Sequence, residues 1–92
     1  MLSYEEFKEK LVTEVTVYAP EKYKNAIVDI MGVPKAEGNV DAIIMRMPDR
    51  NSGASLNCKD LYADYVKSNS FEKTMIRCLQ SLIPYLLSLI HI

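Results

Sequence analysis

The sequence is poor in the residues that build metal and redox sites. It has one histidine, two cysteines and no tryptophan among 92 residues. Cys58 and Cys78 stand apart without the C-x-x-C spacing of zinc sites, and His91 offers the one imidazole. Because a structural zinc site needs about four such ligands, we expect no bound metal and no cofactor. The thiols are expected to be reduced and partly buried, although the sequence leaves a single disulfide open.

An excess of charge of one sign is also missing. Eleven Lys and Arg residues balance twelve Asp and Glu residues, which gives a net charge of −1. With no positive field to attract polyanions or anionic lipids, we expect no nucleic-acid binding and no membrane binding. The opening segment MLSYEEFKEK is acidic where a secretory signal is basic and then apolar. We therefore expect a cytoplasmic protein.

A long apolar run is absent until the last residues, LQSLIPYLLSLIHI at 79–92, and Pro84 interrupts that run. A helix that spans a bilayer needs about 20 apolar residues, so this stretch is too short. It is also apolar on every face, which a small domain cannot bury. The ending LSLIHI resembles a translated sequencing adapter. We expect one domain over residues 1–85 and a foreign tail over 86–92; a genuine tail would instead predict a membrane-surface helix or a protein contact.

The remaining composition, 49% hydrophobic and 25% charged, is typical of a globular domain. The first predicted element is an amphipathic helix, because apolar residues recur at intervals of three and four. Its apolar stripe comprises Tyr4, Phe7, Leu11, Val15 and Tyr18. Ser3 and Glu6 have the spacing of a capping box, and Pro20 marks the end of the helix.

Two apolar runs follow, AIVDIMGV at 26–33 and VDAIIMRM at 40–47. The segment between them contains the turn formers Pro34, Gly38 and Asn39, which predicts a hairpin. The second run carries large apolar residues on both of its faces, so we expect it to be the central strand, with helices on at least one side. The segment ASLN after the next loop favours a short third strand.

Two helices complete the pattern. Asn57 and Ser70 are predicted caps, and Asn69 is suited to the left-handed conformation between the helices. The expected apolar faces are Leu61, Tyr62, Tyr65 and Val66 in the first helix, and Phe71, Met75, Cys78 or Leu79, and Leu82 in the second. The order of elements predicts an α+β fold with an N-terminal amphipathic helix, an antiparallel sheet of two or three strands, and two C-terminal helices.

The segments YEEFKEKLVTEV, NVDAIIM and DLYADYVKSNSFEKTM resemble the opening of an uncharacterised bacterial family known as a domain of unknown function. Tyr62 and Tyr65 match the tyrosine pair of that family, and residues 70–72 match its Ser-Leu-Glu helix start with Phe in the middle place. Asn69 stands where the family prefers glycine. The resemblance covers roughly residues 3–80 and implies an N-terminal fragment of a longer protein. It implies no activity.

A restriction-endonuclease-like metal site has an Asp that opens the second strand and an acid-x-Lys motif on the third strand. Here Asp41 takes the first place, and Asn57 and Lys59 of LNCKD take the places of the motif. Such sites need a second carboxylate to hold Mg²⁺, but Asn57 stands in that place. Asp60 or Asp29 would have to replace it. Under the simpler interpretation Asn57 caps a helix and Lys59 is solvated.

Tyr62 and Tyr65 are candidate binding residues, because tyrosine buries a large area at low entropic cost. Their helical spacing equally favours a place in the core. With one histidine, in the doubtful tail, nucleophilic catalysis has no general base. The sequence therefore favours a non-catalytic cytosolic domain that makes protein contacts, within a longer protein or with a partner. The alternative is a divergent or inactive metal-dependent nuclease domain.

Overall fold

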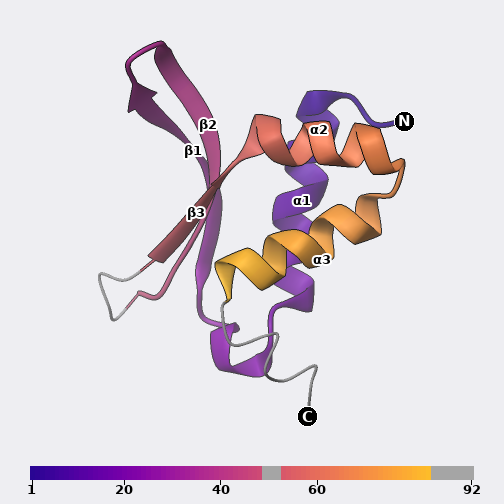
Figure 1. The fold of residues 1–92 in the computed structure, drawn as a ribbon. Coiled ribbons are helices and arrows are strands. Elements are labelled where there is room, and N and C mark those ends of the chain that lie inside the picture. The colour runs from indigo at the N-terminus through magenta and orange to yellow at the C-terminus, as the bar shows by residue number, and fades with distance from the viewer. Residues whose placement is uncertain (49–52, 84–92) are drawn as a thin grey trace.

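The computed structural model describes residues 1–48 and 53–83. Its elements are α1 (Tyr4–Tyr18), a short 3₁₀ turn η1 (Glu21–Tyr23), β1 (Ile27–Lys35), β2 (Gly38–Arg46), β3 (Gly53–Asn57), α2 (Cys58–Ser68) and α3 (Phe71–Leu82). The predicted α+β fold is confirmed (Figure 1). The expectation for the tail at 86–92 concerns residues that lie outside the described part of the chain.

The sheet is antiparallel with the order β1-β2-β3, so the predicted central position of the second strand is confirmed. The predicted third strand is also present. The predicted hairpin loop was too long, because Pro34, Gly38 and Asn39 lie within paired strands and the turn consists of Ala36 and Glu37 alone. Pro34 is tolerated because β1 is an edge strand, where a missing backbone N–H need not break a ladder bond.

The three helices lie on one side of the sheet, which gives two layers (Figure 1). The sheet face toward the helices supplies Val28, Ile30, Ile43, Met45, Ala54 and Leu56 to the hydrophobic core. These residues alternate along each strand as a pleated sheet requires, with Ile30 and Leu56 both opposite Ile43. The other sheet face therefore points away from the helices.

The predicted helix starts are confirmed. Ser3 and Glu6 form a reciprocal capping box, and the Asn57 side chain accepts hydrogen bonds from the backbone N–H groups of Lys59 and Asp60. Ser70 caps α3, and Asn69 before it adopts the left-handed conformation with φ of 54°. Local chemistry alone determines these boundaries, which explains why the sequence predicts them.

Two residues predicted to be apolar contacts are exposed instead. Val66 is 44% exposed, because the buried face of α2 is formed by Cys58, Leu61 and Tyr65 and Val66 lies to the side of it. Tyr18 is 59% exposed, because it is the last residue of α1 and lines an open groove beside α3. In α3 both Cys78 and Leu79 are buried.

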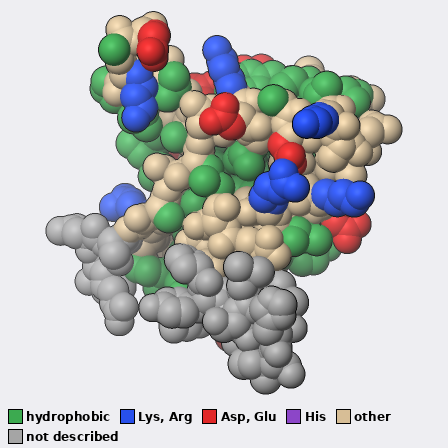
Figure 2. Space-filling view, in the orientation of Figure 1, with side chains coloured by type: hydrophobic (Ala, Val, Ile, Leu, Met, Phe, Trp, Pro, Cys, Tyr) green, Lys and Arg blue, Asp and Glu red, His purple; other side chains and the backbone are tan. Residues whose placement is uncertain are grey.

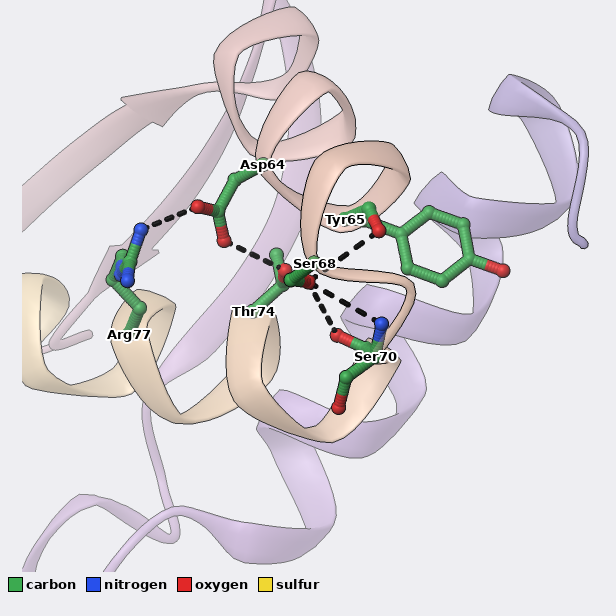
Figure 3. A network of polar contacts seen from close by, with 6 residues as sticks. All are labelled: Asp64, Tyr65, Ser68, Ser70, Thr74 and Arg77. Atoms are coloured by element: carbon green, nitrogen blue, oxygen red, sulfur yellow. Dashed lines mark hydrogen bonds and ion pairs between the residues drawn. The ribbon is translucent and has the colours of Figure 1, made fainter.

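A polar network joins α2 to α3 (Figure 3). The Asp64 carboxylate accepts a hydrogen bond of 2.8 Å from the buried Thr74 hydroxyl and pairs with Arg77. At the turn between the helices, the Ser68 hydroxyl donates to the Ser70 carbonyl and accepts from the Ser70 N–H. The network gives the buried Thr74 hydroxyl a hydrogen-bond partner and links the two helices through their side chains.

Candidate functional site

The Asp41 carboxylate, on the inner face of β2, is the centre of the main polar cluster. One of its oxygens, Oδ2, accepts hydrogen bonds from the Lys8 ammonium at 2.9 Å and from the Tyr4 hydroxyl at 3.0 Å. Lys8 also pairs with Glu5 at 3.2 Å and lies 4.5 Å from the centroid of the Tyr4 ring. The cluster ties α1 to the central strand.

The protonation of this cluster follows from its contacts. The hydrogen bonds from Lys8 and then Tyr4 lower the pKa of Asp41, and the same bond to Asp41 raises the pKa of Lys8. Burial, followed by the hydrogen bond to Asp41, raises the pKa of Tyr4 to about 12. At neutral pH the cluster therefore holds an ionised carboxylate, an ammonium group and a neutral phenol, which is a stable clamp and no proton shuttle.

The structure brings together only some of the residues predicted for a nuclease site. Lys59 is close enough to Asp41 for its charge to lower the pKa of that carboxyl group. Asn57, however, uses its side-chain oxygen as a helix cap, with contacts of 2.8 and 3.1 Å. Asp29 lies on the outer face of β1, opposite Ile44, whereas Asp41 lies on the inner face. Within residues 1–48 and 53–83, no three His, Cys, Asp or Glu residues are grouped to hold a metal.

The structure places Tyr62 and Tyr65 in an aromatic cluster between α1 and α2. Their ring centroids lie 5.3 and 5.2 Å from that of Phe7, which is fully buried. The Tyr62 hydroxyl donates to the Leu2 carbonyl, and the Tyr65 hydroxyl accepts from the Leu2 N–H, both at 2.9 Å. Both tyrosines thus hold the start of the chain against α2, and their polar groups are used within the domain.

Sequence reasoning did not single out the outer face of the sheet. We call the outward residues Ile27, Met31, Val33, Val40 and Ile44 of β1 and β2 the open face. Ile27 is 39% and Met31 49% exposed, and the other three are half-buried. Figure 2 shows apolar side chains on the β1–β2 hairpin, with acidic and basic side chains among them. The signal was present in the second strand, which carries apolar residues on both faces.

Both cysteines are free and fully buried in the core. Neither thiol is part of a disulfide in the described structure, and both are more deeply buried than the sequence predicts. Burial raises the pKa of Cys58 to about 11 and that of Cys78 to about 12. Because the thiolate is the reactive form, neither residue is suited to nucleophilic catalysis.

Comparisons of the chain with protein-family models, curated proteins and solved structures found no match. In the described part of the chain, no helix has the length and apolar character needed to cross a bilayer. The geometry of the chain itself is therefore the basis for a functional proposal.

Proposed function

We propose that the chain is a non-catalytic, cytoplasmic protein-contact domain whose open face packs against an apolar protein surface. That surface belongs to the rest of a longer chain or to a partner protein. The observation that carries the proposal is the apolar character of a sheet face that no described helix covers. An antiparallel sheet with one face in water normally alternates apolar and polar residues, and here the outward positions of β1 and β2 are largely apolar, whereas β3 directs Ser55 and Asn57 outward.

The chemistry of the open face fits this role. A large contiguous apolar patch on the surface of a soluble protein is typical of a site that contacts another protein surface. Met31 adds a flexible and polarisable side chain, which adapts to a partner surface. The outward Asp29 and Arg46 provide charges along the rim of the face, as protein interfaces commonly do. The proposal thus uses residues that the core does not.

The nuclease alternative draws less support from the same structure. The Oδ2 atom of Asp41 is already bonded to Lys8 and Tyr4, so a metal that used this oxygen would have to displace both contacts. Asp29 points to the opposite side of the sheet and is no second ligand to that metal. The proximity of Lys59 is the one feature in favour of the alternative.

Photo-crosslinking tests the proposed function. A benzophenone amino acid at Met31, in the full-length protein within its native cell, is expected to form one discrete adduct with another protein or with a later part of the same chain. The same group at Val66, an exposed site on α2, is the matched control and should not form that adduct. A second substitution on the open face, Ile44→Lys, should remove the adduct. Identical adducts from Met31 and Val66, or an adduct that Ile44→Lys leaves unchanged, would contradict the proposal.

A further inference from the structure

The edge of β1 that faces away from β2 has no partner strand in the described sheet. The strand pairs with β2 on one side only in the described sheet, with a regular register from Ile27 opposite Arg46 to Lys35 opposite Gly38. The N–H of Ile30 donates to the side chain of its neighbour Asp29, at 2.8 Å, and not to β2. Because backbone groups alternate in direction along a strand, Val28, Ile30 and Gly32 all direct N–H and C=O groups outward.

Pro34 is two residues after Gly32, so its backbone nitrogen faces the same side as the N–H groups of Val28, Ile30 and Gly32. Its missing N–H would have pointed outward, so the proline costs no hydrogen bond with β2. It also ends the run of outward donors at Gly32. The usable edge therefore extends from Val28 to Gly32, which at about 3.3 Å per residue matches an added segment of roughly five residues.

A groove runs beside this edge, between β1 and α1. It is open, measures about 570 Å³, and is lined by Glu5, Lys8, Glu9, Val12 and Thr13 of α1 together with Asp29 and Ile30 of β1. Val12 and Ile30 are half-buried and form an apolar floor. A strand added to β1 would direct alternate side chains into this groove, against α1.

The charge of the groove favours one kind of occupant. Three carboxylates line it, and its one cation, Lys8, is already bonded to Asp41 and Glu5. An arriving segment with lysine or arginine would meet a net negative surface. The Asp29 carboxylate, which covers the Ile30 N–H in the free chain, would be released from that bond to pair with the incoming cation.

We infer that the β1 edge and the α1–β1 groove bind an extended, basic peptide segment by strand addition. This inference does not depend on the proposed function of the open face, because it uses the hydrogen-bonding edge of β1 and the groove beside α1, and none of the five open-face residues. Of the outward side chains of β1 it uses Asp29 alone. Hydrogen bonds between the backbones of β1 and the peptide supply the affinity, and the carboxylates of the groove favour peptides with basic side chains.

Two acetylated seven-residue peptides provide the test, one alternating valine with lysine and the other alternating valine with glutamate. The lysine peptide is expected to bind the chain at least tenfold more tightly, measured by fluorescence anisotropy. In ¹H–¹⁵N spectra it should shift the amide signals of Val28, Ile30 and Gly32. No binding of the lysine peptide, equal binding of both peptides, or shifts confined to the open face would overturn the inference.

Substitutions at Gly32 isolate the backbone contribution. Gly32→Pro removes one outward N–H and should lower the affinity for the lysine peptide at least tenfold. Gly32→Ala keeps that N–H and should bind the peptide with the affinity of the wild type. A Cβ at this position meets only the Asn39 Cβ, at 4.0 Å, so Gly32→Ala has room. If Gly32→Pro does not fold, the wild-type chain is tested instead with a lysine peptide whose backbone nitrogens are methylated. This peptide should not bind, because it cannot donate backbone hydrogen bonds to β1.

Equal binding by Gly32→Pro and Gly32→Ala would overturn the inference, as would equal binding by the methylated and unmethylated peptides. Self-association is the remaining outcome. A concentration-dependent dimer that Gly32→Pro abolishes would assign the edge to a second copy of the chain and overturn the peptide assignment.

Discussion

Replacement of Phe7 by alanine is expected to lower the free energy of unfolding by about 3–5 kcal/mol. The Phe7 side chain is fully buried and contacts the rings of Tyr62, Tyr65 and Phe71, with centroid distances of 5.3, 5.2 and 5.8 Å. A domain of this size has a total stability of about 5–14 kcal/mol, so the variant should be close to unfolding at 25 °C. Urea denaturation followed by circular dichroism measures the change.

The control for this prediction is Val66→Ala. Val66 is an apolar residue of α2 outside the buried face, so its truncation should change stability by no more than about 0.5 kcal/mol. If both substitutions shifted the urea midpoint equally, the aromatic cluster would not be the centre of the core.

The second prediction with a large effect compares lysine substitutions on the two faces of the sheet. Ile43 and Ile44 are neighbours on β2, but Ile43 is fully buried under the helices and Ile44 belongs to the open face. Ile43→Lys places a charge in the core without a partner and should cost more than about 4 kcal/mol. Ile44→Lys keeps its ammonium in water and should cost about 1 kcal/mol.

Thermal denaturation of the two lysine variants gives the comparison, with Ile44→Thr as a milder control on the open face. The expected result is an unfolded Ile43→Lys chain and two folded variants at position 44. Equal loss of structure in Ile43→Lys and Ile44→Lys would mean that the outer face is covered within the chain itself.

The elements and their caps were predictable because their causes are local. The Ser3–Glu6 box, the Asn57 cap and the left-handed Asn69 depend on residues within a few positions. The hairpin turn was predicted less well, because Pro34 is a turn former that an edge strand also accepts. Whether β1 is an edge strand depends on the whole sheet and is not a local property.

The cluster around Asp41 was not predictable, because its contacts join residues that are far apart in sequence. Its partners Tyr4 and Lys8 lie 37 and 33 positions away in sequence. Helical periodicity places Tyr4 toward the core but says nothing about which strand it meets. The open face was missed because β2 is apolar on both sides, so alternation does not show which side the helices cover.

Thiol footprinting at Met31 tests the central claim, that another protein surface covers the open face, most directly. The natural cysteines give little background, since both are fully buried and burial raises their pKa values to about 11 and 12. Met31→Cys should react rapidly with a maleimide in the isolated chain and at least tenfold more slowly in the full-length protein within its native cell, while Val66→Cys reacts equally in both. Equal rates for Met31→Cys in the two settings would contradict the account, because the open face would then remain in water where the protein works.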